Sequence, residues 1–93
     1  MSKLDWSEET GVMTLPEVVT LESIPGLLKS KGVLKLPVKE VDFGKVQQVD
    51  SAILALLLTW SNNIQSTLVI ANIPAELQTL IQLYDLESVL QVK

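Results

Sequence analysis

The chain contains no cysteine, no histidine and no arginine among its 93 residues. Without cysteine and histidine it cannot form a disulfide, a thiolate nucleophile, a histidine-assisted nucleophile or the commonest zinc site. Without arginine it lacks the side chain that holds a phosphate or a guanine edge through two hydrogen bonds. We therefore expect no catalytic residue, no metal ligand, no cofactor and no nucleic-acid partner.

Charged residues and long apolar runs are also scarce. Charged residues make up 19% of the chain and hydrophobic residues 47%, with a formal net charge of −4. This composition is typical of one small globular domain with a modest core. The longest apolar run, Ala52–Leu58, is far shorter than the roughly 18 residues of a membrane-spanning helix. The acidic stretch Ser7–Glu9 argues against a signal peptide. We expect a soluble protein, and the lack of cysteine suits a reducing cytoplasm.

The first half of the chain predicts strands and one short helix. Gly11–Leu21 is rich in β-branched residues, and Pro16 within it predicts either an edge strand or two short pieces. Ser23–Gly32 begins with a capping serine and a proline, which predicts a short helix. Val33–Pro37 is ambiguous between strand and loop. Lys39–Phe43 alternates acidic and apolar side chains and predicts a strand covered on one face.

The second half predicts two longer helices around a buried strand. Ser66–Ala71 is a continuous apolar run with β-branched residues, which indicates a central strand buried on both faces. Pro74 opens a helix whose apolar side includes Leu77, Ile81 and Tyr84. The alternation of strands and helices favours an α/β domain with a mixed or largely parallel sheet. The earlier helix carries a wide apolar stripe: Ile53, Leu54, Leu56, Leu57, Leu58, Trp60 and Ile64.

Asp50 and Ser51 stand directly before that helix, and three roles are open to them. Either side chain can cap the free N–H groups of the helix that begins at Ala52, a contribution of about 1 kcal/mol. Ser51 could be a nucleophile only with a lysine as its base, because the chain has no histidine and no G-x-S-x-G turn. The third role is a hydroxyl that a partner protein reads or phosphorylates.

Two stretches resemble STAS domains, the sulfate transporter and anti-sigma factor antagonist family. Val49–Leu58 is similar to the family signature, in which a strand ends in an Asp-Ser or Asp-Thr step that opens a helix. Pro74–Leu86 looks like the last STAS helix, with the Leu-Tyr-x-Leu ending of MlaB-type members. The resemblance covers residues 11–90, preceded by an extension or first short strand (1–10) and followed by a tail (91–93). It implies a single small STAS-like α/β domain whose mixed sheet carries helices mainly on one face.

The resemblance implies a non-enzymatic interaction module with one of two partners. MlaB-type proteins bind the ATPase subunit of a bacterial ABC transporter that moves phospholipids and supports outer-membrane lipid asymmetry. Anti-sigma factor antagonists instead bind a serine kinase, which phosphorylates the residue at the position of Ser51. The short chain and the ending Leu83–Leu86 favour the transporter, so the kinase is the alternative. The protein is then expected in the cytoplasm, reaching the inner membrane only through its partner.

By position, the resemblance places the partner surface at the Asp-Ser step and the start of the helix. Ile53 departs from the glycine usual in the family, and it could also simply join the core stripe. A phosphate on Ser51 would gain about 0.3–1 kcal/mol from the helix amino terminus but lose about 1–3 kcal/mol to Asp50. Phosphorylation is therefore expected to break a docking surface. The residues expected at the surface are Asp50, Ser51, Ala52 and Ile53, with Leu56 and Trp60 as weaker candidates at the outer edge of the stripe.

A structural alternative to binding another protein is pairing with a second copy of the same chain. A poorly protected sheet edge near Pro16 would allow two copies of the chain to pair as a homodimer.

Overall fold

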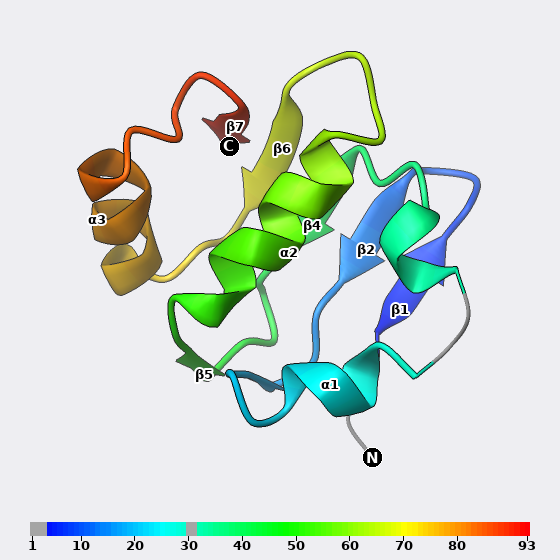
Figure 1. Ribbon diagram of the computed structural model, residues 1–93, viewed down its shortest axis with the longest axis horizontal. Coiled ribbons are helices and arrows are strands. Elements are labelled where there is room, and N and C mark those ends of the chain that lie inside the picture. The colour runs from blue at the N-terminus through cyan, green and yellow to red at the C-terminus, as the bar shows by residue number, and fades with distance from the viewer. Residues whose placement is uncertain (1–3, 30–31) are drawn as a thin grey trace.

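A mixed sheet forms the centre of the described part of the chain, residues 4–29 and 32–93 of a computed structural model. β1 pairs with β2 in antiparallel fashion, and all further pairings in this sheet are parallel (Figure 1). The prediction of an α/β domain with a mixed sheet is confirmed. The five strands are, in spatial order, β1 (Asp5–Ser7), β2 (Val12–Thr14), β4 (Glu40–Asp42), β6 (Leu68–Ala71) and β7 (Leu90–Val92).

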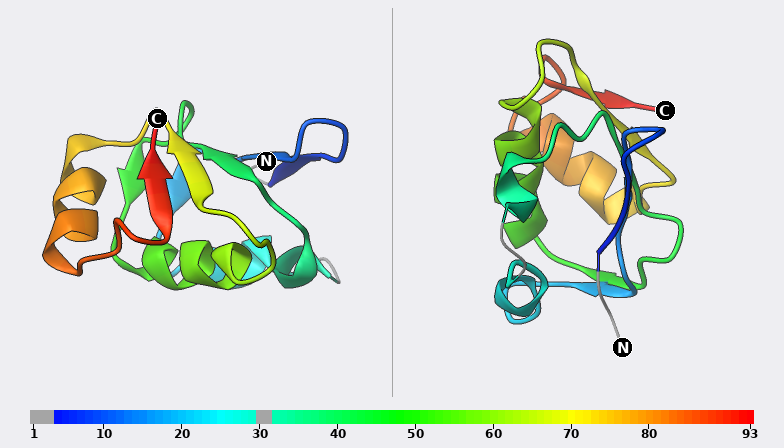
Figure 2. Two further views of the ribbon diagram at one scale, coloured as in Figure 1. Left: turned by 90° about the horizontal axis from the view of Figure 1, so that it is seen from above. Right: turned by 90° about the vertical axis from the view of Figure 1, so that its right-hand side faces the viewer.

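The helices lie on one side of this sheet, as predicted. Figure 2 shows α1 and α2 against one face, with α3 flanking the sheet on the same side. A second, two-stranded parallel sheet joins β3 (Val18–Val19) to β5 (Gln48–Val49). Residues 1–3 of the expected extension, and residues 30–31 near the expected helix end, lie outside the described residues. The helices are α1 (Ile24–Leu27), the 3₁₀ helix η1 (Val33–Lys35), α2 (Ala52–Ser61) and α3 (Ala75–Leu83).

The core lies between the sheet and the helices. Met13, Val41 and Ile70 stand in register on β2, β4 and β6, and all three are fully buried. The neighbouring positions Glu40 and Val69 point to the opposite face and are only half-buried. The alternation predicted for β4 is therefore confirmed, whereas the burial of both faces predicted for β6 is met only in part.

α2 covers the centre of the sheet with the predicted apolar stripe. Ala55 on the opposite side of the helix is exposed. The indole Nε1–H of Trp60 donates a hydrogen bond to the Val33 carbonyl oxygen at 3.0 Å, which ties η1 to the end of α2. The helix ends at Ser61, so Ile64 packs against the core from the following loop. The buried residues of α2 are Ile53, Leu54, Leu56, Leu57 and Trp60.

Pro16 separates two short strands, β2 and β3. β2 pairs on both sides, with β1 and with β4, and Pro16 itself is buried. Both predicted alternatives describe part of this segment. The chain leaves β2 at Thr14 and forms a second short piece, β3, which has a single partner in the two-stranded sheet and is therefore an edge strand. The outer strands of the five-stranded sheet are β1 and β7. Homodimer formation stays a prediction, which sedimentation at low concentration tests.

Candidate functional site

The two-stranded sheet positions the Asp-Ser step predicted from the sequence. Val19 at the end of β3 lies opposite Val49 at the end of β5, and both strands run in the same direction. The ladder begins at the Glu17 carbonyl oxygen, which accepts the N–H groups of Gln47 and Gln48 at 2.7 and 3.0 Å. Because parallel strands in register end side by side, the residues that follow them emerge as neighbours. The turn after β3 and the start of α2 therefore meet at one edge of the molecule (Figure 1).

The Asp50 carboxylate joins these two segments. Oδ1 accepts the N–H of Ala52 at 3.0 Å, and Oδ2 accepts the N–H of Leu21 at 3.0 Å. The first bond closes an Asx turn and satisfies a helix N–H that has no partner within the helix. Asp50 therefore performs the capping that the sequence allowed to either residue, and it also fixes a turn 29 positions away along the chain.

Ser51 is exposed, and its hydroxyl is not used to start the helix. Within the part of the chain that the structure describes, the Ser51 side chain makes no capping hydrogen bond, although its carbonyl oxygen accepts the N–H of Leu54 at 3.1 Å. Ala52 beside it is half-buried. Of the expected surface residues, the structure thus brings Asp50, Ser51 and Ala52 together at the start of α2, with the Ser51 hydroxyl facing solvent.

Three expected contact residues lie elsewhere. Ile53 and Trp60 are fully buried and Leu56 is 4% exposed, all in the core cluster. The placement of Leu56 and Trp60 at the outer edge of the stripe is wrong, because both lie on the side of α2 that packs into the core. Ile53 follows the second alternative and joins the core stripe. These side chains offer no accessible surface to a partner in this conformation.

The turn between β3 and α1 is held by Ser23. Its hydroxyl accepts the N–H of Thr20 at 2.9 Å and donates to the Val18 carbonyl oxygen at 3.1 Å. Ser23 precedes α1 as predicted, but its side chain bonds back into the turn and does not cap the helix. Leu21 within this turn is 71% exposed. Sequence analysis assigned Leu21 to a strand and missed its place beside Asp50, because no local pattern connects residues so far apart.

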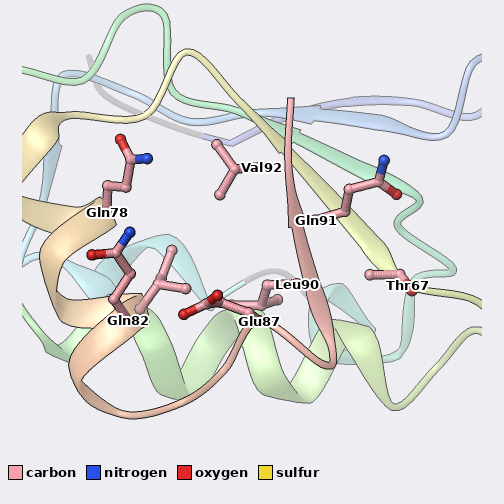
Figure 3. A pocket seen from close by; sticks show the side chains of 8 residues that line it. Thr67, Gln78, Gln82, Glu87, Leu90, Gln91 and Val92 are labelled. Carbon is pink, nitrogen blue, oxygen red and sulfur yellow. The ribbon is translucent and has the colours of Figure 1, made fainter.

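A separate groove lies between α3 and β7. It has a volume of about 470 Å³. Figure 3 shows Gln78 and Gln82 projecting from α3 beside the strand, with Leu90 and Val92 on the side of β7. Glu87 contributes a carboxylate to the lining. Thr67 also lines the groove, and these polar groups can form hydrogen bonds. The groove belongs to a different part of the fold from Asp50 and Ser51.

The described residues offer few means for chemistry. Among residues 4–29 and 32–93, no group of three acidic side chains could hold a metal ion. No polar or charged residue of these ranges is buried. None of the helices described above is long and apolar enough to cross a lipid bilayer. What the Asp-Ser step presents is an exposed serine beside a carboxylate that is fixed by two backbone hydrogen bonds.

Comparison with known proteins identifies the family of the chain. None of the curated proteins matches the chain. The family model described as "Mlab, STAS domain" matches residues 2–91, which is nearly the whole chain. The match includes all of the described strands and helices except the last residue of β7. The chain therefore belongs to the MlaB-type STAS domain family.

Proposed function

We propose that this domain is a cytoplasmic accessory subunit that docks onto the ATPase of an ABC transporter for phospholipids. Membership of the MlaB-type family implies association with the Mla ABC transporter, and domains of this type are generally non-catalytic. The docking surface is formed by Asp50, Ser51 and Ala52. The protein reaches the inner membrane through this partner and supports lipid asymmetry by supporting the ATPase.

One observation carries the assignment of this surface. The Ser51 hydroxyl is exposed at a helix start whose capping is already performed by Asp50. A serine that is not needed to start its helix can be replaced by another neutral residue at little cost to the fold, since surface substitutions usually change stability by less than about 0.5 kcal/mol. Its hydroxyl is free for a hydrogen bond to the ATPase.

Replacing Ser51 with glutamate is expected to weaken the association by about tenfold or more, because a new charge beside Asp50 would have to be desolvated at the contact. The measurement is affinity purification of the tagged protein from its native cell, with mass spectrometry of the retained proteins. Wild type should retain an ABC ATPase and its permease, and Ser51→Glu should lose both.

The control is Ser88→Glu, which adds the same charge at another exposed serine, in the loop before β7. This variant should retain the transporter as wild type does. Retention of the transporter by Ser51→Glu, or its absence from the wild-type eluate, would contradict the proposal.

An anti-sigma factor kinase is the second candidate partner. The same exposed hydroxyl is accessible to a kinase, which favours this alternative. The usual glycine two residues after the phosphorylated position is replaced here by Ile53, whose side chain is fully buried. A serine kinase in the wild-type eluate, together with a phosphate on Ser51, would select the kinase over the transporter.

A further inference from the structure

Leu21 combines exposure with a fixed backbone. Its side chain is 71% exposed, although leucine is among the residues most often buried. Its N–H is bound by Asp50 Oδ2 at 3.0 Å, and the other oxygen of the same carboxylate binds the N–H of Ala52. One side chain thus connects an exposed apolar group to the helix start that carries Ser51.

The turn that carries Leu21 is held from a second side as well. The Ser23 hydroxyl bonds both Thr20 and Val18, and the Thr20 carbonyl oxygen accepts the N–H groups of Ser23 and Ile24 at 3.0 and 2.9 Å. A group held in place before binding loses little backbone freedom when a partner covers it, which favours affinity. The turn therefore presents an apolar side chain on a preorganised backbone.

We propose that Leu21 is the apolar anchor of the ATPase contact and that Asp50 is the positioning residue that holds it beside Ser51. This inference rests on the function proposed above. It extends the docking surface from the start of α2 onto the turn before α1. Leu21 has a carboxylate on each side, since Glu22 follows it and Asp50 binds its backbone. The matching site on the ATPase is an apolar pocket edged by basic side chains, because such a rim complements these two carboxylates.

Leu21→Ser is the direct test, with Leu83→Ser as the matched control. Both leucines are 71% exposed, but Leu83 ends α3, whereas Leu21 lies in the turn before α1 (Figure 1). The purified variants are titrated with the purified ATPase subunit, and circular dichroism verifies that each is folded. Leu21→Ser should weaken binding by about tenfold or more, and Leu83→Ser by less than about twofold. Equal effects of the two substitutions on binding would overturn the assignment of Leu21 as the anchor.

The positioning role of Asp50 is tested through its coupling to Leu21. Asp50→Asn keeps only one acceptor oxygen, so one of the two hydrogen bonds is lost. Alone it should weaken binding severalfold and speed hydrogen exchange at the Leu21 or the Ala52 amide. In the Leu21→Ser background the same change should weaken binding clearly less than it does alone, because only the direct contact of Asp50 remains to be lost. An equal loss in both backgrounds would show that Asp50 acts independently of Leu21.

Two results distinguish failure of this inference from failure of the proposed function on which it rests. If wild type does not bind the ATPase, both are overturned. If wild type binds and Ser51→Glu does not, while Leu21→Ser binds as tightly as Leu83→Ser, the proposed function stands and the anchor alone is wrong.

Discussion

Replacing Trp60 with alanine is expected to lower the free energy of unfolding by about 3–5 kcal/mol. The indole is fully buried where α2 ends, and its Nε1–H donates to the Val33 carbonyl oxygen. Truncation would leave a cavity and remove the hydrogen bond that ties η1 to α2. Domains of this size have a total stability of about 5–15 kcal/mol, so the variant should be folded only marginally. Chemical denaturation followed by circular dichroism measures the change.

Trp60→Phe is the control for this experiment. It keeps most of the ring volume but loses the donor to Val33, which should cost about 1–3 kcal/mol. A Trp60→Ala variant that stays within about 1 kcal/mol of wild type would contradict the burial of this side chain. A core role also predicts that the folded fraction of Trp60→Phe binds the proposed ATPase partner with the affinity of wild type, whereas a contact residue would lose affinity.

Replacing Ile53 with glycine, the residue usual in the family at this position, is expected to cost about 3–5 kcal/mol of stability. Ile53 is fully buried in the first turn of α2, so glycine would remove the whole buried side chain. Glycine within a helix also costs up to about 1 kcal/mol relative to alanine. The measurement is again the free energy of unfolding from denaturant titration.

The matched control is Ala55→Gly, at an exposed position in the same helix. This change carries the helix penalty without the loss of a buried side chain, so it should cost only about 1 kcal/mol. Similar costs for the two variants would mean that Ile53 contributes no packing. A larger cost for Ile53→Gly than for Ala55→Gly would indicate that the Ile53 side chain contributes to core packing and does not serve only as part of the docking surface.

Periodicity in the sequence was sufficient to predict the main helices and strands. The stripe on α2 and the alternation in β4 predicted which side chains face the core, because burial of apolar area requires those periods. At the end of α3 the same reasoning misplaced Tyr84, which is 56% exposed. The helix ends at Leu83, so Tyr84 stands at the C-cap and no longer continues the apolar side of the helix, and Asp85 with φ 57° then turns the chain.

The sequence could not predict the shortest strands or the contacts that depend on them. In the two-stranded sheet, β5 has only two residues. In the five-stranded sheet, β7 continues to Val92, in the segment that was expected to be a tail. Neither strand is long enough to produce a clear periodic signal. The Asp-Ser step was found from local chemistry and from the family resemblance. Which of its two side chains caps α2, and which distant turn Asp50 binds, depends on the pairing of Val19 with Val49.

Because β3 and β5 pair in parallel, binding of a partner at this surface depends on whether the subunit is already folded. Leu21 and Asp50 belong to segments that meet only when the chain has closed this ladder, so a nascent or partly folded chain does not present the two together. A partner that recognises the closed arrangement selects native subunits. By mass action it also protects them, since a partner at a hundred times its Kd adds about 2.7 kcal/mol to apparent stability. Subunits made in excess of such a partner would then be the first that cellular proteases remove.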